Sequence, residues 1–175
     1  MTFDPEKHHR RSIRWKCADY TAEGRYFITI CTHAGRCVLG SVEGPDTVLS
    51  DVGRVVQECW LDLPERMSFV ELGAHVLMPN HLHGIIIIVR SAADNRPAPA
   101  THCPAGSVGA IIRSFKAEST RRVRERRGDP NFHLWQRNYY EHIVRGYKSL
   151  AAISRYIREN PVHWHRDLEN PDAAR

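Results

Sequence analysis

The feature that most constrains the fold is the run HLHGIIIIV at residues 81–89, which places two histidines just before a stretch of aliphatic residues. A short apolar run rich in β-branched residues is typical of a buried strand. Burying an imidazole is unfavourable unless hydrogen bonds or a metal hold its nitrogens. Residues i and i+2 of a strand share a face, so His81 and His83 should stand side by side. The run therefore predicts a buried sheet that carries two adjacent imidazoles.

The rest of the chain supplies the other elements of a small α+β domain. The turn MPNH should join the histidine strand to the strand before it as an antiparallel hairpin. The chain order is then strand, helix, two strands, helix, strand and a last helix, which predicts a ferredoxin-like split β-α-β antiparallel sheet with helices on one face and a C-terminal catalytic helix. The other strands are expected at 25–31, 68–78 and 139–145, and the helices at 49–66, 107–127 and 148–160.

Composition sets the class of protein and its compartment. A chain of 175 residues is long enough for one core domain with appended segments. We expect a basic arm at 1–24, the domain at 25–162 and a polar tail at 163–175. The five cysteines lack any C-x-x-C spacing, which favours reduced thiols in the cytoplasm over a structural zinc site. With no apolar run of membrane-spanning length and no signal-peptide core, we expect a cytoplasmic protein without a membrane partner.

The last predicted helix carries residues that could complete a site with the histidines. Tyr156 and Asn160 are four residues apart and so lie on one flank of that helix. If the flank faces His81 and His83, the Asn160 amide oxygen would complete a set of ligands that suits Mg²⁺ or Mn²⁺. Tyr156 would then stand one turn away as a nucleophile. The alternative is structural: hydrogen-bonded histidines, a core-edge tyrosine, and an asparagine that ends the helix before Pro161.

Positive charge gathers in the predicted helix at 107–127, where seven basic and two acidic residues give +5, the net charge of the whole chain. Such a helix could hold DNA phosphates, although a merely solvated basic surface has the same composition. Further contacts could come from the N-terminal arm and from Trp135, Gln136 and Arg137, where Trp135 could equally belong to the core. The candidate DNA-binding residues are Arg113, Lys116, Arg121, Arg122, Arg137, Arg11 and Arg14.

Three segments together resemble one known family. The runs HVLMPNHLHGIIIIV, LWQRNYYEHIVR and ISRYIRENPVHW, in this order, are similar to the REP-associated tyrosine transposases of the one-tyrosine HUH superfamily, over roughly residues 11–164. The resemblance implies that His81 and His83 are the HUH motif, Tyr156 the nucleophile and Asn160 the third metal ligand. The tail after Trp164 carries no sign of the family.

The resemblance also implies an activity. Members cut and rejoin single-stranded DNA with Mg²⁺ or Mn²⁺ through a 5′-phosphotyrosine intermediate, so we expect a transposase that recombines hairpin-forming repetitive palindromes (REP elements) in the nucleoid. Both monomers and homodimers fit. The alternatives differ in class. A histidine-triad hydrolase would need a third histidine where Ile85 stands. A rolling-circle initiator would carry a lysine after its tyrosine, and a non-catalytic hairpin binder would keep only the fold and the basic helix.

Overall fold

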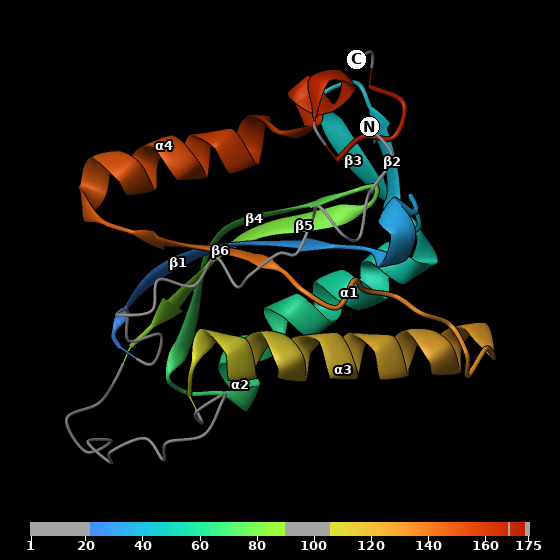
Figure 1. The fold of residues 1–175 in the computed structure, drawn as a ribbon, viewed down its shortest axis with the longest axis horizontal. Coiled ribbons are helices and arrows are strands. Elements are labelled where there is room, and N and C mark those ends of the chain that lie inside the picture. Colours follow the sequence, from blue (N-terminus) through green and yellow to red (C-terminus); the bar gives the residue numbers. More distant parts are fainter. Residues whose placement is uncertain (1–21, 90–105, 168, 174–175) are drawn as a thin grey trace, which may run out of the picture.

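A computed structural model describes residues 22–89, 106–167 and 169–173 (Figure 1), so Arg11 and Arg14 of the predicted arm lie outside the described residues. Four strands form one antiparallel sheet in the order β4-β5-β1-β6. Because β5 lies between β1 and β4, the first strand–helix–strand unit is split, as predicted from the element order. The strands are β1 (Gly24–Cys31), β4 (Val70–Met78), β5 (His81–Ile88) and β6 (Tyr140–Val144).

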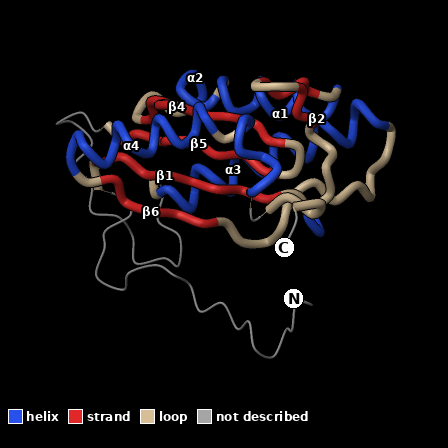
Figure 2. Tube along the Cα trace, turned by 90° about the horizontal axis from the view of Figure 1, so that it is seen from above, coloured by secondary structure: helices blue, strands red, loops and turns tan. Residues whose placement is uncertain are grey.

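Helices cover both faces of the sheet (Figures 1 and 2). The lower face in Figure 1 packs on the first three helices, and the last helix lies across the upper face, against β4 and β5. Successive side chains of β5 point to opposite faces of the sheet. Leu82, Ile86 and Ile88 enter the core on the lower face, whereas His81 and His83 point to the upper face. The helices are α1 (Asp51–Leu61), α2 (Leu63–Arg66), α3 (Val108–Arg127) and α4 (Gly146–Glu159).

Local signals set the ends of these helices. Ser50 and Ser107 each accept a backbone N–H of the first turn through their hydroxyls, so they cap α1 and α3. Gly128 ends α3 in the left-handed region, with φ of 64°, which lets the chain turn back along the helix. Within the described ranges, no helix is both long enough and apolar enough to cross a bilayer.

Two features depart from the sequence-based expectations. A second, two-stranded sheet forms a hairpin from β2 (Gly40–Glu43) and β3 (Asp46–Leu49), in a segment where no strand was predicted. The spacing of Leu150, Ile153 and Ile157 along α4 also predicts a buried apolar stripe, but only Ile157 is buried and the other two are half-buried. The upper face is therefore a thinner layer than the lower core, and it leaves side chains of α4 open to ligands.

Gly84 lets α1 approach β5 closely. A Cβ on Gly84 would lie 2.4 Å from the ring of Trp60, which is fully buried. We expect Gly84→Ala to lower the free energy of unfolding by about 1–3 kcal/mol, because Trp60 must shift within a packed core. Urea denaturation measures the change. Gly24→Ala is the control, because its Cβ would meet Tyr26 at an ordinary 3.5 Å. Equal stability of both variants would contradict the close packing.

Candidate metal and tyrosine site

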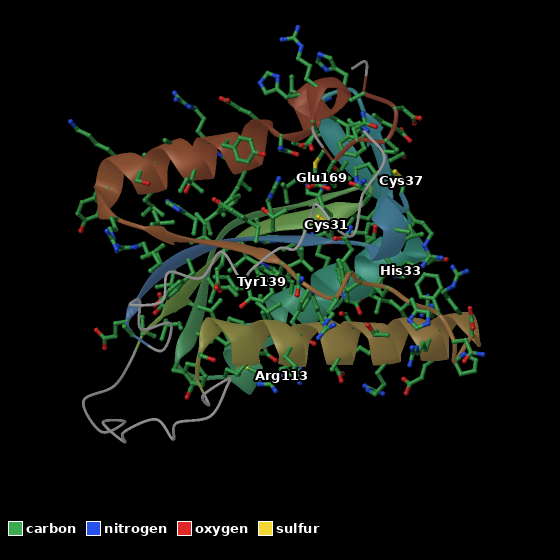
Figure 3. All side chains as sticks on the ribbon, viewed as in Figure 1. Cys31, His33, Cys37, Arg113, Tyr139 and Glu169 are labelled. Carbon is green, nitrogen blue, oxygen red and sulfur yellow. The ribbon has the colours of Figure 1, made fainter. Side chains whose placement is uncertain are left out.

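The two histidines lie together on the α4 side of the sheet. Cross-strand pairing sets His81 opposite Cys31 and His83 opposite Thr29. The imidazole centroids are 4.4 Å apart, and both side chains are buried. In Figure 3, Cys31 marks this end of the sheet, and Glu169 of the tail lies on the same side as α4. The pairing of the imidazoles on one face is thus as predicted.

Hydrogen bonds orient both rings. The Nδ1 of His81 is 2.9 Å from the Asn80 amide oxygen, which can only accept, so Nδ1 carries the proton and Nε2 keeps its lone pair. The Nδ1 of His83 is 2.9 Å from the Thr29 hydroxyl. Metal-binding histidines are commonly fixed in this way, through the nitrogen that does not bind the ion. Each Nε2 is therefore the nitrogen available to a ligand.

Burial keeps both imidazoles neutral. It lowers the pKa of His81 to about 4. It also lowers the pKa of His83 to about 3, where the neighbouring His81 lowers the value further and Asp167 opposes the shift. At neutral pH neither ring carries a second proton, so no proton competes with a cation for the Nε2 lone pairs.

Asn160 and Asp167 bring oxygen atoms to the same place. Asn160 follows the last residue of α4, and its amide nitrogen donates to the Asp167 carboxylate at 3.2 Å. That carboxylate lies 4.0 Å from Nε2 of His81. One possible ligand atom from each of His81, His83 and Asp167 lies within 4.8 Å of the other two. The site thus combines the three predicted ligand candidates with a carboxylate that was not predicted.

The donor set fits a divalent cation. Nε2 of His81 and Oδ1 of Asn160 are both buried, and neither has a hydrogen-bond partner among the described residues. Such unpaired buried atoms are unfavourable unless a ligand satisfies them. Imidazole nitrogens together with amide and carboxylate oxygens are common ligands of divalent metal ions. His81, His83, Asn160 and Asp167 are therefore the residues that could hold the ion.

No sequence pattern marked Asp167 as a candidate metal ligand. It lies just after the 3₁₀ helix Pro161–Arg166, in the segment expected to be a polar tail. Its carboxylate also accepts the backbone N–H of Glu169 at 2.8 Å, and Asn80 donates to the Glu169 carbonyl at 2.5 Å. These contacts hold the segment against the turn before β5. Glu169 and Asp172 are equally acidic neighbours, so composition could not single out Asp167.

Tyr156 lies at the open side of this cluster. Its hydroxyl is 3.3 Å from Nε2 of His83, and its ring packs edge-on against Phe27. The side chain is 48% exposed, so a large substrate could reach the oxygen. Burial raises the pKa of Tyr156, Asp167 raises it further, and a hydrogen bond with Asn160 opposes the shift. The phenol is therefore protonated at neutral pH when the site holds no cation.

The predicted DNA-binding residues of α3 lie on the other face of the sheet. Arg113 is exposed and points away from the sheet (Figure 3). Arg121 pairs with Glu118 and Glu125, and Arg122 pairs with Glu118 and Asp62. The guanidinium groups of Arg121 and Arg122 are therefore engaged in ion pairs, and Asp62 adds a negative charge beyond the two acidic residues of α3 itself. The structure does not bring these residues next to Tyr156.

Lys116 and Arg137 differ in their surroundings. The Lys116 ammonium donates to the carbonyls of Gln136 and Asn138, at 2.8 and 2.9 Å. Burial lowers its pKa to about 8. It therefore fixes the chain after α3 as well as carrying charge. Arg137 is exposed on that chain.

Comparison with known proteins finds a sequence relative and a solved structure of the same fold. The chain is 42% identical over 168 residues to an uncharacterised protein of Haemophilus influenzae, covering 91% of this chain and 92% of that protein. The solved structure of a REP-associated tyrosine transposase bound to a REP hairpin superimposes with a TM-score of 0.58 at 18% identity, covering 85% of this chain and 73% of that one. No protein family model matches the sequence.

Proposed function

The chain belongs to the same protein family as the Haemophilus influenzae relative and has the fold of a REP-associated tyrosine transposase, and from this we propose that it is a metal-dependent transposase that cuts and rejoins single-stranded DNA. One observation carries the proposal. The Tyr156 hydroxyl lies 3.3 Å from a buried imidazole, beside a cluster of nitrogen and oxygen atoms of which two lack partners among the described residues. A nucleophile beside a cation site is the arrangement that phosphoryl transfer requires.

The residues of the chain have distinct roles in this proposal. His81, His83, Asn160 and Asp167 would hold Mg²⁺ or Mn²⁺, with Asn80 and Thr29 orienting the two imidazoles. A divalent cation held there supplies Lewis-acid stabilisation of the negative charge that develops on a phosphate. Tyr156 lies at the exposed side of these residues, so its hydroxyl could reach a DNA phosphate bound beside them.

The covalent step replaces the phosphodiester bond of the DNA by a phosphodiester to tyrosine, so the free energy of the bond is retained. Tyr156 Oη attacks the phosphorus in line, the bond to the 3′ oxygen breaks, the phenol proton passes to solvent, and the departing 3′ oxygen takes up a proton from solvent. The products are a 5′-phosphotyrosine and a free 3′-OH. A second 3′-OH can attack the phosphotyrosine and reverse the step on a new strand, so cleavage and rejoining need no ATP. One tyrosine thus serves both the cleavage and the rejoining step of the proposed transposition.

The substrate is single-stranded DNA next to a hairpin. The Tyr156 ring lies against the sheet, in contact with the rings of Phe27 and His83, which favours a flexible strand over a rigid duplex. The solved transposase of the same fold is bound to a REP hairpin, which supports a hairpin-forming palindrome as the DNA partner here. The described residues of one chain bring Tyr156 and the four proposed ligands together, so the proposed cleavage needs no residue from a second copy, although a homodimer also fits.

A labelled hairpin oligonucleotide with single-stranded flanks tests the proposal. With Mn²⁺ or Mg²⁺, the 3′-labelled strand should appear on a denaturing gel as a protein–DNA adduct, because a 5′-phosphotyrosine retains the 3′ portion. The 5′-labelled strand should appear as a shorter fragment, and EDTA should abolish both products. Tight DNA binding without either product would instead identify a non-catalytic hairpin-binding protein.

The Asp167 carboxylate yields a separate prediction about metal affinity. Asp167→Asn should weaken Mn²⁺ binding by at least about 10-fold, because it removes a charged oxygen that faces His81 at 4.0 Å. Calorimetric titration of the protein with Mn²⁺, without DNA, measures this directly. Asp172→Asn is the matched control, since Asp172 is an exposed acid of the same tail. Equal affinity of both variants would exclude Asp167 from the site.

A further inference from the structure

A groove of about 920 Å³ lies on the face of the sheet opposite Tyr156, and the proposed catalysis does not use it. Its walls are α3 and the chain that turns back along this helix after Gly128 on its way to β6 (Figure 1). Its volume is that of a typical small-ligand site. Its lining includes the side chains of Lys116, Arg121, Arg124, Glu125, Trp135 and Arg137.

Trp135 offers an aromatic surface that is held in place from behind. Its indole N–H donates to the Ser119 hydroxyl at 2.9 Å, and its ring centroid is 5.6 Å from that of Phe115. The side chain is nevertheless only half-buried and lines the groove. A fixed, partly open indole is the type of platform on which an unpaired nucleobase stacks.

The groove is also positively charged. Four of its lining side chains are cationic and one, Glu125, is anionic. Arg121 is paired with Glu125, whereas Arg124 uses its Nε to hold the Phe132 carbonyl. Arg137 is exposed at the wall formed by the returning chain. Guanidinium groups beside an aromatic platform match a nucleotide, which carries a phosphate next to a base.

The edge of the sheet offers a route between this groove and Tyr156. β6 is an edge strand, and Tyr139 just before it and Tyr140 at its start have contacts on opposite faces of the sheet. Tyr139 contacts Lys116 on the α3 side, where Figure 3 shows it. Tyr140 is 42% exposed and packs against Phe27, which in turn contacts Tyr156. Aromatic rings therefore lie on both faces of the sheet beside this edge.

We propose that the groove binds an unpaired nucleotide of the DNA substrate, with the base stacked on Trp135 and the phosphate held by Arg124 and Arg137. The proposal rests on the proposed DNA substrate. It gives the protein a second DNA site, separated from Tyr156 by the sheet, so the strand must pass around the β6 edge to occupy both. The site would select substrates that carry single-stranded DNA beside the hairpin.

Binding assays with two DNA probes test the groove. In the Tyr156→Phe protein, which cannot form the adduct, fluorescence anisotropy compares a fluorescein-labelled hairpin with an unpaired tail and the same hairpin without one. Arg137→Ala and Trp135→Leu should each weaken binding of the tailed hairpin by at least about 5-fold and leave the blunt hairpin nearly unchanged. Arg54→Ala, an exposed arginine of α1 outside the groove, should change neither.

Each outcome of these assays either supports or overturns nucleotide binding in the groove. Arg137→Ala is a surface change, so it tests the groove even if Trp135→Leu does not fold. Equal losses for both hairpins would show contact with duplex phosphates and overturn the proposal, as would unchanged binding of the tailed hairpin. The adduct assay with the unmodified protein is run in parallel. Absence of an adduct there would refute the proposed catalysis alone, whereas a normal adduct with unaltered tail preference would refute the groove alone.

Discussion

Replacing Tyr156 by phenylalanine should abolish the covalent protein–DNA adduct and strand cleavage, because the variant lacks the oxygen that attacks phosphorus. DNA binding should persist. The ring keeps its packing against Phe27 and His83, and the loss is one hydrogen bond of 3.3 Å, worth about 1 kcal/mol at most. The readouts are the denaturing gel for the adduct and anisotropy for binding.

Tyr147→Phe is the matched control for this prediction. Tyr147 is on the same helix and is 82% exposed, but among the interactions of the described residues its ring lies near Arg25 rather than the histidines. This variant should form the adduct at the normal rate. Adduct formation by Tyr156→Phe at that same rate would show that another residue is the nucleophile.

Replacing either His81 or His83 by alanine should remove both Mn²⁺ binding and metal-dependent cleavage. Each change deletes one Nε2 from a cluster whose ligand atoms lie within 4.8 Å of one another. Loss of a ligand should lower metal affinity by at least about 100-fold, beyond the effect of changing a group that only orients a ligand. Calorimetry with Mn²⁺ and the adduct assay measure the two effects separately.

The chain provides its own control in the segment HWH. His163 and His165 repeat the spacing of His81 and His83, but both are exposed and lie in the 3₁₀ helix rather than in a strand. His163→Ala should therefore bind Mn²⁺ and cleave DNA normally. Full cleavage by the His81 and His83 variants would mean that the cation binds elsewhere. Circular dichroism must show that both variants are folded, because both rings are buried.

Most of the fold could be predicted because local patterns determined it. The aliphatic run that forms β5, the two-residue turn before it and the capped helices α1 and α3 are all encoded within a few neighbouring residues. The hairpin of β2 and β3 was missed because each strand has only four residues, alternating between half-buried and exposed. Such short strands lack the hydrophobic run that makes a strand recognisable.

The site was partly predictable for the same reason. His81 and His83 share a face through strand geometry, and Tyr156 and Asn160 share a flank through helix geometry, so each pair follows from spacing alone. That the two pairs meet depends on α4 crossing the upper face of the sheet. Asp167 could not be predicted, because it reaches His81 only through the hydrogen bonds of Asn80 and Asn160 with the tail.

The separation of the basic helix from Tyr156 has a consequence for the substrate. α3 and α4 lie on opposite faces of the sheet (Figure 1), so a rigid duplex bound along α3 could not also place a phosphate beside the histidines. A hairpin with a flexible single strand could do so by passing the β6 edge. The arrangement therefore favours DNA with a flexible unpaired segment that can pass from one face of the sheet to the other.

Peptide mapping of the trapped adduct tests the proposed mechanism most directly. The protein is incubated with Mn²⁺ and a tailed hairpin, the DNA is removed by nuclease, and the protein is digested and analysed by mass spectrometry. We predict a nucleotide linked through its 5′ phosphate to the peptide that contains Tyr156, with Tyr140 and Tyr147 unmodified. A nucleotide on either of those tyrosines, or a 3′ linkage on any residue, would contradict the mechanism proposed for this site.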